Sequence, residues 1–87
     1  MACYFYILFS QSSDKYYVGR TSDVAGRLRR HNSHHKGFTG KASDWVVVHI
    51  EEYPTKIQAC QRERQVKKWK SRILIEKLID VGSERPD

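Results

Sequence analysis

Residues 3–9, CYFYILF, alternate along the chain in the manner of a β-strand. One face of this strand would carry Tyr4, Tyr6 and Leu8, and the other Cys3, Phe5, Ile7 and Phe9. The polar stretch SQSSDK predicts a turn, and YYVGR at residues 16–20 then resumes the strand pattern. This spacing predicts an antiparallel hairpin with a loop of several residues.

A short helix is predicted over residues 23–31, because the preceding TSD offers three helix-capping side chains. Asn32 is a plausible C-terminal cap for it. Gly26 inside the helix costs about 1 kcal/mol relative to alanine. A loop rich in Gly, Ser, His and Lys follows at residues 33–44.

The strongest strand pattern is WVVVHIEEY at residues 45–53, whose mostly apolar run favours a central strand. Pro54 ends it, and Thr55 with Gln58 has the form of a capping box. A long helix is therefore expected from Lys56 to about Lys70, and a second helical segment from residue 72 to Gly82.

The order β-β-α-β-α-α predicts an α+β fold, with a small three-stranded antiparallel or mixed sheet flanked by helices. With 87 residues the chain is expected to form one domain over residues 1–82, followed by a flexible tail at 83–87. Cys3 and Cys60 lie far apart and form no C-x-x-C motif. No signal-peptide pattern or membrane-spanning run is present, which favours reduced thiols in a cytoplasmic protein.

Sixteen Lys and Arg residues face ten Asp and Glu, a formal net charge of +6. This excess favours an anionic partner, with nucleic acid first, although a basic surface can also serve solubility or bind an acidic protein. The long loop and the long helix together hold half of the Lys and Arg residues. Candidate DNA-binding residues are Arg20, Lys36, Lys41, Lys67 and Lys70.

Alternation in the second strand places Tyr17 and Gly19 on one face and Tyr16 on the other. One tyrosine of the pair can thus belong to a site while its neighbour packs. Gly19 has no side chain, so a ligand or another part of the chain could approach it closely. The alternative for Gly19 is a strand end packed against a helix.

In the first helix, Arg27 and His31 are four residues apart and share a face at the border of the apolar stripe. A guanidinium at such a border can hold a phosphate through two parallel hydrogen bonds. The alternative is a surface arginine whose stem covers apolar side chains. His31 with His34 and His35 could also suggest a metal site, but no acid or cysteine stands at ligand spacing beside them.

Glu63 is the anomaly of the long helix, because it shares a stripe with Ala59, Cys60 and Val66. A carboxylate among apolar neighbours requires a partner. That partner is either an arginine or a hard divalent cation completed by water and a substrate phosphate. The arginine candidates are Arg27, Arg62 and Arg64.

Several short motifs in this order resemble the GIY-YIG nuclease domain, in particular its small stand-alone bacterial members. The resemblance extends from about Ala2 to Ile79. It rests on Tyr4-Phe5-Tyr6, Tyr17-Val18-Gly19, Arg27, His31-Asn32, and Arg62-Glu63 followed by Lys67 and Trp69. Tyr4 departs from the family's glycine. The segment SRILIEKL lacks the asparagine that many members carry after the glutamate.

The resemblance implies a DNA endonuclease that hydrolyses phosphodiesters with Mg²⁺ or Mn²⁺ bound at Glu63. It further implies that Arg27 stabilises the phosphate and that Tyr17 activates water beside Tyr6 or His31. Lacking an appended DNA-reading module, such a core is expected to select DNA structure over sequence, in repair or recombination. Two alternatives stay open: Tyr17 could attack phosphorus directly, and the chain could be an inactive nucleic-acid-binding module that needs a partner protein.

Overall fold

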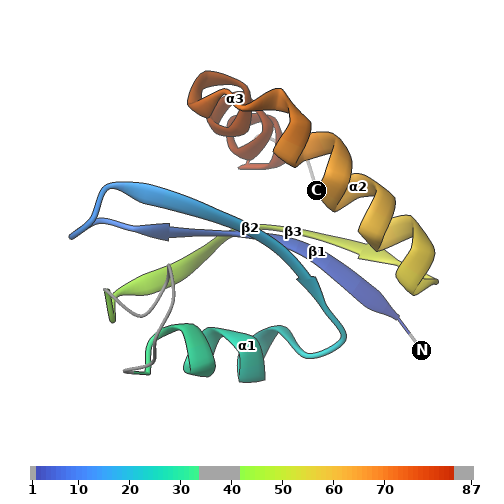
Figure 1. Cartoon of the computed structure of the whole chain (residues 1–87), viewed down its shortest axis with the longest axis horizontal. Helices are drawn as coiled ribbons and strands as arrows, with labels where there is room; N and C mark the ends of the chain where they lie inside the picture. The colour runs from blue at the N-terminus through green and yellow to red at the C-terminus, as the bar shows by residue number, and fades with distance from the viewer. Residues whose placement is uncertain (1, 34–41, 84–87) are drawn as a thin grey trace.

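A computed structural model describes residues 2–33 and 42–83 of the chain (Figure 1). Its six elements follow the predicted order β-β-α-β-α-α. They are β1 (Cys3–Ser10), β2 (Lys15–Thr21), α1 (Val24–His31), β3 (Trp45–Tyr53), α2 (Lys56–Trp69) and α3 (Arg72–Ser83). No helix in the described parts of the chain is both long and apolar enough to cross a membrane.

The three strands form an antiparallel sheet in the order β2-β1-β3, so β1 and not β3 is the central strand. The expectation of a central β3 is wrong because its apolar run is not buried on both faces. Val46 and Ile50 of β3 are 52% and 48% exposed. In β1, by contrast, Phe5 and Leu8 on opposite faces are both fully buried.

Helix α1 covers one face of the sheet, and α2 and α3 cover the other (Figure 1). The alternation in β1 divides the core accordingly. On the side of α2 and α3, the buried residues are Phe5, Ile7, Val18 and Val66. On the side of α1, they are Tyr6, Leu8, Ala42 and Trp45, with Tyr17 and Leu28 packed against them. The two adjacent tyrosines of β2 therefore face different layers, as the sequence predicts.

Capping side chains begin both of the first two helices. Asp23 accepts from the backbone N–H of Gly26 at 3.1 Å, and Thr55 accepts from that of Gln58 at 3.3 Å. Helix α2 is followed by its C-terminal cap Lys70, whose φ of 49° lies in the left-handed region where glycine is usual. The predicted tail lies outside the described residues except for Ser83, which closes α3 one residue beyond the expected end at Gly82.

Asn32 does more than end α1. Its side-chain amide donates to the backbone carbonyl of Trp45 at 3.0 Å and accepts from the Trp45 N–H at 2.7 Å. Both backbone groups at the start of β3 are thereby satisfied, and the end of α1 is fixed against the sheet. This holds His31, the residue before Asn32, in its place over β1.

Candidate active site

Three aromatic side chains meet between the sheet and α1. The hydroxyl of Tyr6 lies 3.1 Å from Nε2 of His31, and both residues are buried. The ring of Tyr17 lies against the His31 ring, with centroids 4.6 Å apart. The Tyr6 and Tyr17 rings are 6.3 Å apart. The hairpin and the last turn of α1 thus bring together residues that are up to 25 positions apart in the sequence.

Gly19 makes room for these phenols. A Cβ atom at Gly19 would lie 2.7 Å from the Tyr6 hydroxyl oxygen and 3.0 Å from a ring carbon of Tyr17. These separations are shorter than ordinary van der Waals contact. The glycine is therefore required by the close approach of two side chains from the same site, and packing of a strand end against a helix does not account for it.

The electrostatic surroundings of Tyr6 show which other groups reach this site. Burial is the largest cause that raises the pKa of Tyr6 to about 12, and Tyr17 and Glu63 add to it. The Arg27 guanidinium acts in the opposite direction. Tyr6 therefore keeps its proton at neutral pH, and it lies within electrostatic reach of Tyr17, Arg27 and Glu63.

Arg27 is exposed, and its guanidinium makes no hydrogen bond or ion pair with any other described residue. It lines a hollow of about 330 Å³ between the start of α1 and the ends of β1 and β2. Arg20 and Lys56 line the same hollow. Three cationic side chains around one depression provide a favourable place for an anionic oxygen.

Glu63 lies on α2 with its side chain 17% exposed, and basic groups meet both of its oxygens. Arg20 Nε is 3.1 Å from Oε1, and Lys67 Nζ is 2.6 Å from Oε2. The expectation that Arg27, Arg62 or Arg64 neutralises Glu63 is therefore wrong. Arg62 instead pairs with Glu51, whose oxygen lies 3.0 Å from Arg62 Nε.

The donor set around Glu63 fits a weakly held, hard divalent cation. No cluster of three or more metal-ligating His, Cys, Asp or Glu side chains occurs within residues 2–33 and 42–83, so water and substrate oxygens would have to complete the coordination of an ion at Glu63. Lys67, which occupies one carboxylate oxygen, is 53% exposed and free to turn away. Although close to Glu63, the buried Arg20 Nε–H has no hydrogen-bond acceptor among the described residues. An additional oxygen at this point would satisfy it.

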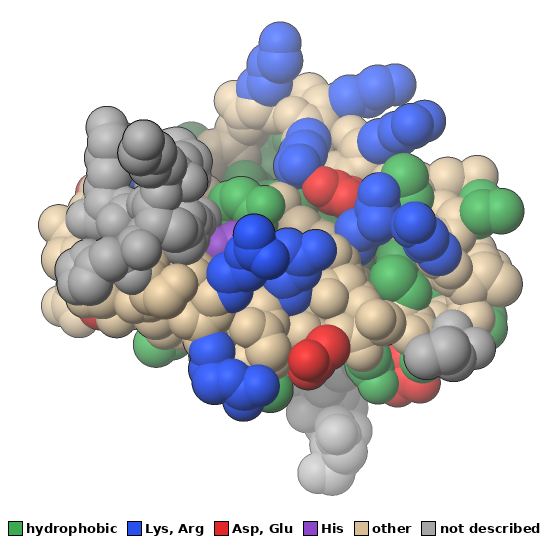
Figure 2. Space-filling view, turned by 60° about the horizontal axis from the view of Figure 1, so that its bottom comes forward, with side chains coloured by type: hydrophobic (Ala, Val, Ile, Leu, Met, Phe, Trp, Pro, Cys, Tyr) green, Lys and Arg blue, Asp and Glu red, His purple; other side chains and the backbone are tan. Residues whose placement is uncertain are grey.

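The remaining basic candidates separate into two groups. Arg20, Lys67 and Lys70 lie around Glu63 or at the end of α2. Lys36 and Lys41 lie outside the described residues, as do His34 and His35. Figure 2 shows Lys and Arg side chains gathered over one face, around an acidic side chain and next to a histidine. The described part of the site is thus strongly basic, as the net charge led us to expect.

Sequence reasoning missed two features of this region. One is the role of Arg20, which contacts Glu63 from the far side of the sheet relative to Tyr17. The other is a hollow of about 520 Å³ along β2, bounded by the junction of α2 and α3. The available signal was the stretch KWKSR, where one helical pattern gives way to another without a glycine.

Comparison with known proteins agrees with this geometry. The family model of the GIY-YIG catalytic domain matches residues 2–77. The chain is 38% identical over 65 residues to the structure-specific endonuclease subunit slx1 of Schizosaccharomyces japonicus. That match covers 70% of the chain but only 24% of the relative, so the chain spans about a quarter of that protein's length.

A solved structure shares the whole fold. The solution NMR structure of the UPF0213 protein BH0048 from Bacillus halodurans superposes with a TM-score of 0.62 at 28% sequence identity. The superposition covers 97% of this chain and 89% of that one. The arrangement of strands and helices described above is therefore shared nearly end to end with a small natural protein.

Proposed function

The chain belongs to the GIY-YIG family of nuclease domains, and from this premise we propose that it is a metal-dependent endonuclease that hydrolyses DNA phosphodiester bonds. The proposal rests on the residues that surround the hydroxyl of Tyr6. Tyr6 touches His31 and lies beside Tyr17, and Arg27 and Glu63 both influence its pKa, which supports a common site for the five predicted catalytic groups.

The two phenols have different roles in the proposed reaction. Tyr17 is the general base that takes a proton from the attacking water, while Tyr6 stays protonated and orients His31 and Tyr17. The Tyr17 hydroxyl makes no hydrogen bond with a described residue, so it is available to a substrate. A tyrosine normally ionises at a pKa of about 10, and it acts as a base near neutrality only where nearby cations stabilise the phenolate.

Arg27 binds the scissile phosphate. Its guanidinium has no competing acid in the described chain and shares its hollow with Arg20 and Lys56. As water attacks, negative charge grows on the phosphate oxygens, and a positioned arginine stabilises this charge more than it stabilises the substrate. The bond from phosphorus to the leaving oxygen then breaks, and that oxygen is protonated from solvent.

Glu63 holds the divalent ion, Mg²⁺ or Mn²⁺, whose charge when bound would stabilise the phosphate and the departing oxygen. Lys67 neutralises the carboxylate in the metal-free chain, and its exposed ammonium would be free to contact the DNA backbone if Glu63 held an ion. Arg20 keeps Glu63 oriented. This arrangement explains why the long helix carries an acid among apolar neighbours.

The substrate is a branched, flapped or single-stranded DNA, and not a particular sequence. Basic side chains around the site contact phosphates, which carry no sequence information. The slx1 relative is itself named a structure-specific endonuclease subunit. We accordingly place the activity in DNA repair or recombination, in the cytoplasm.

The proposal is tested by incubating the chain with supercoiled plasmid, single-stranded DNA and branched DNA in Mg²⁺, Mn²⁺ or EDTA. Cleavage is expected with a divalent ion and not in EDTA. Glu63→Gln should lower the rate at least about a hundredfold, because a neutral amide holds the ion poorly. Glu52→Gln, the same change at an exposed position of β3, is the matched control and should cut normally.

A second candidate is a nucleic-acid-binding module that gains activity only with a partner protein, as the word "subunit" in the relative's name allows. The net charge of +6 favours binding by itself. Salt-dependent binding of branched DNA without nicking in either metal would support this candidate and contradict the first. A chain whose basic face serves an acidic protein would bind DNA weakly under the same conditions.

A further inference from the structure

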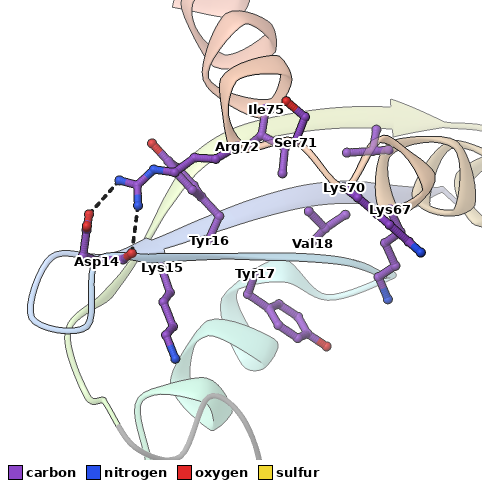
Figure 3. A pocket seen from close by; sticks show the side chains of 11 residues that line it. Asp14, Lys15, Tyr16, Tyr17, Val18, Lys67, Lys70, Ser71, Arg72 and Ile75 are labelled. Carbon is purple, nitrogen blue, oxygen red and sulfur yellow. Dashed lines mark hydrogen bonds and ion pairs between the residues drawn. The ribbon is translucent and has the colours of Figure 1, made fainter.

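A hollow of about 520 Å³ runs along the outer edge of β2, next to the candidate active site. Figure 3 shows Val18 on its floor, the Asp14–Arg72 ion pair at one end, and Lys67 with Lys70 at the other. Val66 and Ile75 add apolar surface from α2 and α3. A hollow of this volume, with an apolar floor and a few polar groups at the rim, is typical of a binding site for a small molecule or a single nucleotide.

The hollow adjoins the site of the proposed reaction at the edge strand β2 and at α2. Lys67 lines it, and its Nζ lies 2.6 Å from Glu63. Tyr17 borders it from β2, with its ring turned toward α1 on the other face of the strand (Figure 3). An occupant of the hollow therefore lies next to the Lys67–Glu63 pair of the proposed site. Lys70 makes no ion pair with a described residue, so its charge is available to an anionic occupant.

Backbone strain also marks this hollow. Among the described residues, the two non-glycine residues with positive φ are Asp14 at 53° and Lys70 at 49°, and both line it. Left-handed conformations cost conformational free energy in any residue with a Cβ atom. Glycine would be favoured at the end of α2, yet a lysine stands there. Such strain is found where a side chain is needed for function.

We propose that this hollow receives one unpaired nucleotide of the DNA, with its base over Val18 and Ile75 and its phosphate at Lys70. The inference rests on the proposed nuclease function and narrows its substrate. A base reaches such a hollow only by leaving the stack, which costs least where the base has no partner. The preferred substrate then carries an unpaired nucleotide directly beside the cleaved bond, as a flap or a bulge does.

The first test measures binding in EDTA, so that its outcome does not depend on cleavage. Fluorescence anisotropy is recorded with a flapped duplex in which one abasic residue is moved through successive positions around the junction. One position should weaken binding roughly five- to a hundredfold, as expected when one base loses its contact surface. Equal affinity at every position would overturn the inference. Fully paired duplexes with the same abasic positions provide the control and should show no such position.

The second test uses Lys70→Gly, which removes both the charge and the strain. The variant should bind the flapped duplex roughly three- to tenfold more weakly while its unfolding midpoint rises by a few degrees. Lys68→Gln removes the same charge from the exposed surface of α2, outside the hollow, and should lose less affinity. An equal loss in the two variants would contradict a specific role for Lys70.

The third test locates the base directly. Deoxythymidine monophosphate is titrated into the isotope-labelled chain, and methyl resonances are followed by NMR. The methyls of Val18 and Ile75 should shift and saturate, while those of Val46 on the exposed edge of the sheet should not. Shifts confined to other residues, or none at all, would overturn the inference.

The possible failures are distinguishable. A chain that shows the abasic effect but never nicks DNA keeps this nucleotide site and loses the proposed nuclease activity. A chain that nicks DNA with no abasic effect keeps the nuclease and loses the nucleotide site. Dimerisation that competes with DNA at the hollow would assign the surface to a second copy instead.

Discussion

The hydroxyl of Tyr6 on the central strand lies 3.1 Å from Nε2 of His31 at the end of α1, with both residues almost completely buried. Because the pKa of Tyr6 is raised to about 12, chiefly by burial, this phenol is a hydrogen-bonding group and not a base. The neighbouring residue Tyr17 is partly exposed, and its ring packs against His31. Burial of Tyr6 thus agrees with the different roles that the resemblance implies for the two tyrosines.

We predict that Tyr17→Phe slows cleavage by about a hundredfold or more while branched DNA binds with unchanged affinity. Tyr6→Phe should have the smaller effect, because it removes one hydrogen bond and leaves the ring in place. Single-turnover cleavage and binding in EDTA measure the two quantities separately. A Tyr17→Phe variant that cuts at the normal rate would show that another group is the base.

The same variant pair also tests direct attack by Tyr17 on phosphorus. Attack by the phenol would leave a covalent link between the protein and a DNA end. Denaturing gels of wild-type reactions stopped early would then contain a protein–DNA adduct that is lost in Tyr17→Phe and retained in Tyr6→Phe. Hydrolysis by water, which we expect, leaves no such adduct at any time.

Gly19→Ala should damage the site and the fold together. The added methyl would lie 2.7 Å from the Tyr6 hydroxyl and 3.0 Å from Tyr17, so both phenols must move. We expect a loss of about 1–3 kcal/mol in the free energy of unfolding and a marked loss of activity. Denaturant unfolding and the plasmid assay measure these effects.

Gly26→Ala is the informative comparison. A Cβ atom at Gly26 would lie 2.3 Å from a carboxylate oxygen of Asp23, the exposed cap of α1, and near no residue of the site. The lost cap costs about 1 kcal/mol, and the gain in helix propensity offsets a similar amount. Stability and activity should therefore stay close to wild type. Equal damage from the two substitutions would show that Gly19 has no special relation to the phenols.

Much of the fold could be predicted because local patterns and tertiary packing agree. The alternation in β1 separates the two core layers, and Asp23 and Thr55 cap the helices that their sequence positions predict. The apolar run VVV in β3 led to the wrong prediction that β3 is the central strand. Apolar character indicates how much of a strand could be buried, whereas its place in the sheet depends on which strands pair, and local sequence does not encode that.

The partner of Glu63 could not be predicted for a related reason. An acid on an apolar stripe requires a cation, but several arginines satisfy that requirement equally well in the sequence. Arg20 was selected by the packing of α2 across β2, a relation between segments more than 40 residues apart. Lys67 is a local partner, four residues after Glu63 on the same helix. The convergence of Tyr6, Tyr17 and His31 was easier to anticipate, because strand alternation and one helical turn fix their directions.

Asn32 connects the site to the sheet, and its loss should be costly. Its amide satisfies both the N–H and the carbonyl of Trp45, so Asn32→Asp places a carboxylate oxygen against that carbonyl. We expect a loss of about 2 kcal/mol or more, since a buried acceptor is left without a donor. Gln61→Glu makes the same change on the exposed surface of α2 and should alter the free energy of unfolding little. Urea denaturation measures the free energy of unfolding of both variants, and equal losses would contradict the role of Asn32.

Tyr6 should also make the fold sensitive to alkali. Its pKa is about 12 in the folded chain and about 10 when unfolded, so the folded state binds the proton more tightly. The associated stability is fully present below pH 10 and is lost as pH rises toward 12. Tyr16 and Tyr53, whose pKa values are raised by burial and by hydrogen bonds to Glu76 and Glu51, contribute in the same direction.

The free energy of unfolding of Tyr6→Phe should therefore depend less steeply on pH in this range. Its absorbance titration should lack the last phenol to ionise. An unchanged slope would mean that Tyr6 ionises freely, and its hydroxyl could then no longer be assigned a purely hydrogen-bonding role.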